Sequence, residues 1–132
     1  MQFAKPARSA LTTESDVEQK FIFPLLVSEL PTGFGYQPSD IHTKTSVKRI
    51  MIDKGERRKL YYPDYVVTAS GLPMLIIEAK APGSNLSEAF REARLYAAEL
   101  NSSYPTGLNP CSLIIAVDGE RLVAGHADQA EP

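Results

Sequence analysis

The fold of this chain is decided by the stretch MLIIEAK, residues 74–80. Its first four residues, 74–77, form an uninterrupted apolar run of the kind found in a central β-strand that is covered on both faces. Glu78 and Lys80 follow directly, and strand alternation puts them on one face and Ala79 on the other. An uncompensated buried carboxylate is unfavourable by several kcal/mol or shifts its pKa. A cation is therefore expected beside Glu78, and Lys80, an arginine or a metal ion can supply it.

The residues before this stretch predict an antiparallel partner strand. A turn over Ala69–Pro73 joins residues 74–77 to an earlier strand, Lys59–Thr68. Folding the hairpin at this turn sets Asp64 within one or two residues of register from Glu78. The two carboxylates are therefore expected to meet.

Two adjacent carboxylates repel one another and are tolerated mainly when a cation lies between them. Ligand sets made of oxygen alone favour a hard ion such as Mg²⁺ or Mn²⁺. Proline lacks the donor that a strand ladder needs and is found at edges or bulges, so Pro63 is expected to bend the strand and re-aim Asp64. The sequence thus predicts a divalent metal shared by Asp64 and Glu78.

Helical and strand patterns continue on both sides of this hairpin. Hydroxyl and acidic residues at the start predict a helix from Thr13 to about Leu30, kinked at Pro24. An apolar stripe at i, i+3, i+4 and i+7 spacing predicts a second helix, capped by Asn85 and running to Leu100. Further strands are expected at Ile41–Asp53, Ser112–Val117 and Arg121–Ala124, with turns at Asp53–Glu56 and Asp118-Gly119.

This order of helix, three strands, helix and two strands indicates an α/β fold with a mixed central β-sheet flanked by helices. The second helix has the right length for a crossover, so the strands on either side of it are expected to be parallel. The three earlier strands are expected to be antiparallel. We expect one domain over residues 1–125, with residues 126–132 as a tail or the start of a linker.

The composition excludes several classes of protein. A chain of 132 residues with 43% hydrophobic and 23% charged side chains has one core, and its formal charge of -2 does not by itself predict a nucleic-acid partner. The single Cys111 cannot form an intrachain disulfide and, with only His42 and His126, offers too few ligands for structural zinc. No apolar stretch approaches the ~20 residues of a membrane span. A cytoplasmic protein without a membrane partner is expected.

Positive charge is concentrated in one segment. Seven Lys and Arg residues within residues 44–59 face two acids, a local balance of +5. Such clustering suits contact with a phosphate backbone and predicts DNA binding that weakens with salt. The other interpretation is a solvated hairpin flank that prevents strand aggregation. The seven residues are Lys44, Lys48, Arg49, Lys54, Arg57, Arg58 and Lys59.

Taken in order, these motifs resemble a known family. Pro63-Asp64 followed by Glu78-Ala79-Lys80 resembles the PD-(D/E)xK nuclease superfamily. Glu18 ahead of residues 21–26 (FIFPLL), then residues 63–67 (PDYVV) and 77–82 (IEAKAP), is similar to the N-terminal nuclease domain of type I restriction enzyme R subunits. The resemblance covers most of the chain.

The resemblance implies a restriction-endonuclease-like α-β-β-β-α-β core and a metal-dependent endonuclease that hydrolyses DNA in a restriction or antiphage system. Asp64 and Glu78 would ligate Mg²⁺, or Mn²⁺ in its place, together with the Ala79 backbone carbonyl. Lys80 would orient or help to deprotonate the attacking water. Glu18 would complete the acidic cluster.

Two details of the resemblance stay open. Glu14 competes with Glu18 as the acid of the first helix. Many relatives carry Gln-x-x-x-Tyr on the second helix, where this chain has Glu92 and Tyr96, and glutamate cannot donate as an amide does. Tyr96 is still a candidate DNA contact, with a place in the core as the alternative.

The partners expected are DNA and a motor or other defence subunit or domain on a longer chain, because no phosphate-binding loop occurs in these residues. Two rival functions remain. One is a catalytically inactive nuclease-fold module that binds nucleic acid or a partner subunit. The other is an assembly or regulatory domain unrelated to nucleic acid.

Overall fold

In a computed structural model of the chain, five strands form one sheet in the order β1-β2-β3-β4-β5. The structure describes residues 2–43, 63–129 and 131–132. Strands β3 and β4 are parallel and the other neighbours are antiparallel, which confirms the predicted mixed sheet. The strands are β1 (Ile41–Thr43), β2 (Tyr65–Ala69), β3 (Leu72–Ala79), β4 (Leu113–Val117) and β5 (Leu122–His126).

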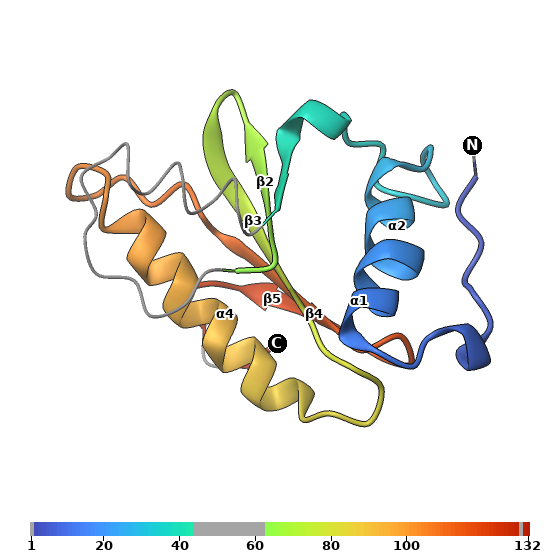
Figure 1. The fold of residues 1–132 in the computed structure, drawn as a ribbon. Helices are drawn as coiled ribbons and strands as arrows, with labels where there is room; N and C mark the ends of the chain where they lie inside the picture. Colours follow the sequence, from blue (N-terminus) through green and yellow to red (C-terminus); the bar gives the residue numbers. More distant parts are fainter. Residues whose placement is uncertain (1, 44–62, 130) are drawn as a thin grey trace.

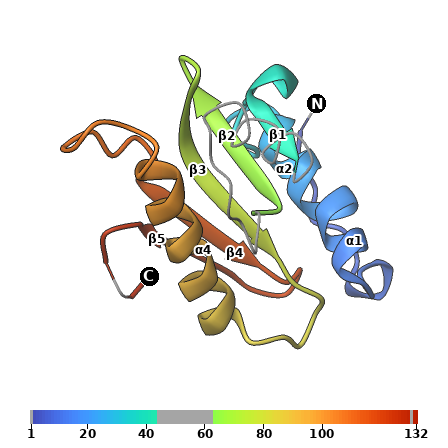
Figure 2. The same ribbon diagram turned by 60° about the vertical axis from the view of Figure 1, so that its left-hand side comes forward.

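Helices cover both faces of the sheet. In Figures 1 and 2, α1 and α2 lie on one side and α4 on the other, so the protein has three layers. The first helical stretch consists of α1 (Glu14–Asp16), the π-helical segment η2 (Val17–Ile22) and α2 (Phe23–Val27). The crossover helix α4 spans Leu86–Asn101, and short 3₁₀ turns occupy Arg8–Ala10 and Pro38–Asp40.

The first helix starts where predicted but ends earlier than Leu30. It leaves helical geometry at Ser28, whose hydroxyl donates to the Pro24 carbonyl at 2.6 Å. The following segment then folds back, and its backbone N–H groups donate to carbonyls of the last turn, which removes the need for further helix. The irregularity expected at Pro24 takes the form of the π-helical register that ends just before it.

The hairpin between β2 and β3 is tighter than expected. Its turn consists of Ser70 and Gly71, both with positive φ, whereas Ala69 and Pro73 belong to the strands. The register shifts between Val67 and Thr68, opposite Pro73, so this hairpin has its bulge there, while Pro63 precedes the first pair of β2.

Strand β2 begins at Tyr65, after both Pro63 and Asp64. Within the described residues, the predicted strand Lys59–Thr68 is therefore wrong in including Pro63 and Asp64. Strand β1 ends at Thr43 in the described residues. The rest of the predicted strand Ile41–Asp53, the Asp53–Glu56 turn and residues 59–62 lie outside the described residues.

The second half of the chain follows its prediction closely. Asn85 caps α4, with its side chain accepting from the Glu88 backbone N–H at 3.1 Å. Strand β5 runs to His126, two residues beyond the predicted end, because it stays paired with β4 as far as the Leu113–His126 pair.

The two faces of β3 belong to separate apolar clusters, which confirms that this strand is buried on both sides. The α4-side cluster contains Ile76, and the α1-side cluster contains Leu75 and Ile77. None of the helices in the described parts of the chain combines the length and apolar character needed to cross a membrane.

Two glycines with similar φ values allow a matched test of the packing around the β4–β5 turn. Gly119 has φ +91°, and a Cβ there would lie 2.8 Å from the Leu11 Cδ1 atom, whereas Gly71 has φ +79° and open space. We expect Gly71→Ala to reduce the free energy of unfolding by about 1 kcal/mol through backbone strain alone. Gly119→Ala should reduce it by about 1 to 3 kcal/mol more, through overpacking. Urea unfolding of both variants measures the difference, and equal effects would contradict the close contact.

Candidate active site

Asp64 and Glu78 lie directly opposite one another at one end of the sheet. Tyr65 pairs with Ile77, so the next residues along the two chains, Asp64 and Glu78, face one another. The Asp64 backbone N–H donates to Glu78 Oε1 at 3.1 Å, and the Ala79 backbone N–H donates to Asp64 Oδ2 at 2.8 Å. Both acidic residues are only 4% exposed. Two buried carboxyl groups therefore lie side by side, one just before β2 and one near the end of β3.

Burial dominates the protonation of Glu78. Loss of solvent raises the pKa of its carboxyl group to about 8, and the Asp64 carboxylate adds to this shift. The hydrogen bond from the Asp64 N–H and the charge of Lys80 oppose it. Near neutral pH, Glu78 thus holds a proton in the absence of a further cation.

Lys80, one of the three cations that the sequence offered to Glu78, reaches toward helix α4 and pairs with Glu92. Its Nζ atom lies 3.5 Å from Glu92 Oε2, and both side chains are partly exposed. Burial disfavours the ammonium form, but the carboxylates of Glu92, Glu78 and Glu14 outweigh it and raise the pKa of Lys80. Lys80 is therefore a stable cation at the edge of the site.

The first helix contributes two acids, where the sequence left a choice between them. Glu14, Glu18 and Asp64 each offer a carboxylate oxygen, and these oxygens all lie within 4.8 Å of one another. Glu78 does not belong to this close set. The Tyr65 hydroxyl donates to the Glu18 carbonyl at 3.4 Å and ties the helix to β2. Burial, then the charges of Glu18 and Asp64, raise the pKa of Tyr65 to about 12.

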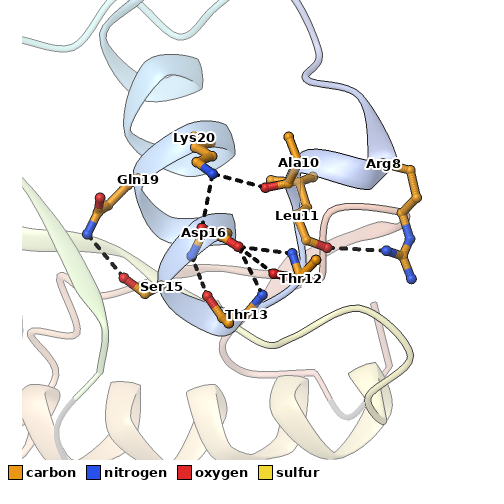
Figure 3. Close-up of polar contacts among 9 residues, drawn as sticks. All are labelled: Arg8, Ala10, Leu11, Thr12, Thr13, Ser15, Asp16, Gln19 and Lys20. Atoms are coloured by element: carbon orange, nitrogen blue, oxygen red, sulfur yellow. Dashed lines mark hydrogen bonds and ion pairs between the residues drawn. The ribbon is translucent and has the colours of Figure 1, made fainter.

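The helix start is held in place by a network of polar contacts, drawn in Figure 3. Thr13 caps the helix by accepting from the Asp16 N–H at 3.0 Å, and the Asp16 carboxylate accepts from the backbone N–H groups of Thr12 and Thr13. Lys20 joins Asp16 at 3.1 Å and donates to the Ala10 carbonyl. These contacts, chiefly the hydrogen bond from the Thr12 N–H, hold the pKa of Asp16 well below its usual range.

This cap determines where the helix acids lie. Glu14 is the first residue of α1 and Glu18 lies four residues later in the π-helical segment, so the two share one face of the helix. The cap satisfies the free backbone donors of the first turn, so the helix begins at a defined residue. Both carboxylates are consequently presented toward the end of β2.

The donor set fits a hard divalent cation. Two oxygens bound to one Mg²⁺ at 2.0–2.1 Å are at most about 4.2 Å apart, so carboxylates within 4.8 Å need only a small movement to share an ion. The raised pKa of Glu78 points the same way, since its burial and the charge of the Asp64 carboxylate outweigh the charge of Lys80. The Ala79 carbonyl remains a predicted ligand.

The other predicted contact residues fall into two groups. Tyr96 is partly buried on α4 and packs against the α4-side cluster, as its core interpretation expected. The basic residues predicted to bind DNA lie outside the described residues, so their proposed contacts stay predictions. They are Lys44, Lys48, Arg49, Lys54, Arg57, Arg58 and Lys59.

A hollow of about 720 Å³ opens at the opposite end of the sheet, away from these carboxylates. Its walls come from the last turn of α4, the loop that follows and the start of β4, and they include Cys111. Burial raises the pKa of the Cys111 thiol to about 12. The Asn101 side chain donates to the Cys111 carbonyl and accepts from the Cys111 backbone N–H. The hollow therefore lies apart from the clustered acidic residues, although His126 and Asp128 line part of it.

Sequence reasoning missed two acidic side chains at this end of the sheet. The sequence marks Glu92 only as the residue in place of a glutamine, and its pairing with Lys80 depends on the packing of α4 across β3. The sequence indicates Asp118 only as a turn residue, yet its side chain is buried. Its position just after an apolar strand, like that of Glu78, was the available signal.

Comparison with known proteins identifies the family. The sequence model of the type I restriction enzyme R protein N terminus matches residues 47–132, which is more than half of the chain. The chain belongs to this family. The match includes Asp64, Glu78 and Lys80, while the helix acids Glu14 and Glu18 precede it. A search of curated proteins and a search of solved structures gave no match. The family confirms the resemblance drawn from the sequence.

Proposed function

We propose that this domain of the R-protein family is a Mg²⁺-dependent endonuclease that hydrolyses DNA phosphodiester bonds in a restriction or antiphage system. The observation that carries the proposal is the meeting of Asp64 and Glu78 on adjacent strand ends, with Lys80 at the edge. Two further acids reach the same point from the first helix. Carboxylates and a lysine in this arrangement supply the ligands and the cation that phosphodiester hydrolysis requires.

The roles of the residues follow from their surroundings. Asp64, Glu14 and Glu18 would hold the divalent ion, with Glu78 joining as it releases its proton. When bound, such an ion lowers the pKa of water and neutralises charge on the phosphate. Lys80 is held as an ammonium group by Glu92 and would stabilise the negative charge that develops on the phosphate oxygens.

Incubation of the protein with supercoiled plasmid tests this function. We expect nicked and linear DNA with Mg²⁺ or Mn²⁺ and intact plasmid with EDTA, because the carboxylates need a cation to act on a phosphate. DNA binding is measured on the same samples by the change in fluorescence anisotropy of a labelled duplex.

The two measurements separate the rival functions. Binding that weakens with salt but no cleavage with either ion would favour an inactive module that binds nucleic acid. An absence of both would favour an assembly or regulatory domain. Cleavage that persists in EDTA would contradict the metal requirement.

A further inference from the structure

A buried carboxylate and an exposed arginine lie beside the proposed active site and have no role in it. Asp118 directly follows β4 and is 1% exposed, whereas the Arg121 side chain is 66% exposed. The Arg121 Nη2 atom lies 4.0 Å from Asp118 Oδ2. The two residues bound the turn between β4 and β5.

Their backbones are tied to the strand that carries Lys80. The Lys80 N–H donates to the Val117 carbonyl at 2.9 Å, and the Asp118 N–H donates to the Arg121 carbonyl at 3.2 Å. Lys80, Asp118 and Arg121 therefore stand in a row across the neighbouring strands β3, β4 and β5. Two strand spacings separate Lys80 from Arg121, about 10 Å.

The Asp118 carboxylate is arranged to hold this turn and the arginine together. Its Oδ1 atom accepts from the backbone N–H groups of Glu120 and Arg121, each at 2.8 Å. Within the described residues, its Oδ2 atom has no hydrogen-bond partner, and its nearest cation is the Arg121 guanidinium. Such a buried charge is tolerated when an opposite charge is kept close, so Asp118 restrains where Arg121 lies.

The guanidinium still has donors to offer a ligand. Arginine carries five N–H donors in a planar fork, and a single contact at 4.0 Å leaves most of them free to bind an anion. Gly119, between the two residues, lies close to Leu11 and Val17, since a Cβ at this position would lie 2.8 to 3.6 Å from their side chains, so the turn has little room to shift. A restrained and exposed arginine loses little conformational freedom on binding.

We propose that Arg121 binds the DNA backbone on the side of the active site marked by Lys80, with Asp118 as its positioning residue. This inference rests on the proposed nuclease function and adds a substrate contact to it. One DNA strand carries a phosphate about every 3.4 Å of helix axis, so a duplex whose axis follows this row advances by roughly three phosphate steps over the ~10 Å between Lys80 and Arg121. A strand laid across the strand ends would meet both cations.

The test measures DNA affinity, without cleavage, as a function of salt. Fluorescence anisotropy with a labelled duplex in EDTA compares the unmodified protein with Arg121→Gln. Removing one phosphate contact should weaken binding roughly tenfold at low salt. It should also make the slope of log affinity against log salt shallower by about 0.9. Arg121→Lys should restore most of the slope, because it keeps the charge.

Lys5→Gln is the matched control, because it removes one positive charge from the N-terminal segment that runs along the outer side of α1 and α2 (Figure 1). Equal slopes for Arg121→Gln, Lys5→Gln and the unmodified protein would overturn the inference and leave the nuclease proposal standing. A shallower slope for Arg121→Gln with no plasmid cleavage by any protein would support the contact and count against the nuclease. Unfolding curves of each variant confirm that the fold is intact.

Discussion

Asp64→Asn is expected to reduce Mg²⁺-dependent plasmid cleavage by at least about 100-fold, the effect of removing a principal electrostatic group from an active site. The substitution removes the charge but keeps a side-chain oxygen that can accept from the Ala79 N–H. The fold should therefore survive, and DNA binding in EDTA should change little. Single-turnover cleavage rates measure the effect.

Asp128→Asn is the control for this substitution, because Asp128 is exposed beyond the far end of β5. It should leave the cleavage rate unchanged. Equal rates for Asp64→Asn and the unmodified protein would remove Asp64 from the site and, with it, the central carboxylate of the proposal. A parallel loss of stability and activity would instead point to the structural bond to Ala79.

Glu78→Gln is expected to make the metal-free protein more stable at pH 8, by roughly 4 kcal/mol in the free energy of unfolding. The pKa of Glu78 is about 8 in the folded protein against 4.5 for an ordinary glutamate. Between these values the folded state keeps a proton that the unfolded state has released. The stability of the unmodified protein should therefore fall as the pH rises from about 5 to 8, and a neutral amide should abolish most of this fall.

Denaturant unfolding in EDTA at pH 5 and pH 8 measures the difference. Glu131→Gln, near the exposed C-terminal end, is the matched control and should keep the pH dependence of the unmodified protein. If Glu78→Gln also keeps it, the carboxyl group of Glu78 is not the source of the instability. A stabilisation of the unmodified protein by Mg²⁺ at pH 8 would show that a cation replaces the proton.

The hairpin that forms the site was predictable because the apolar run and the turn that specify it are close together in the sequence. An apolar run flanked by turn residues predicts where β3 lies, and the turn at Ser70 and Gly71 then places Asp64 within one residue of the position opposite Glu78. Counting back from this turn pairs Asp64 with Ile77, and the bulge between Val67 and Thr68 moves the pairing by one residue to Glu78. The bulge was not predictable, since it depends on how Pro73 is accommodated opposite Thr68.

The acids from the first helix were predictable only as a pair of alternatives. The cap at Thr13 and the four-residue spacing of Glu14 and Glu18 are visible in the sequence. That both carboxylates approach Asp64 depends on how the helix lies across β2, to which the Tyr65 hydroxyl connects it. Such an approach is set by packing between elements distant in the chain.

The sequence alone specifies the order of the elements, the mixed sheet, and the approach of Asp64 to Glu78 within one or two residues of register, because hydrophobic periodicity and turn chemistry act between near neighbours. The tertiary structure decided which cation faces which acid. Lys80 pairs with Glu92 across a helix, and Arg121 with Asp118 around the β4–β5 turn. Coulomb interactions and desolvation depend on distances in space and on burial, which exist only once the layers have packed.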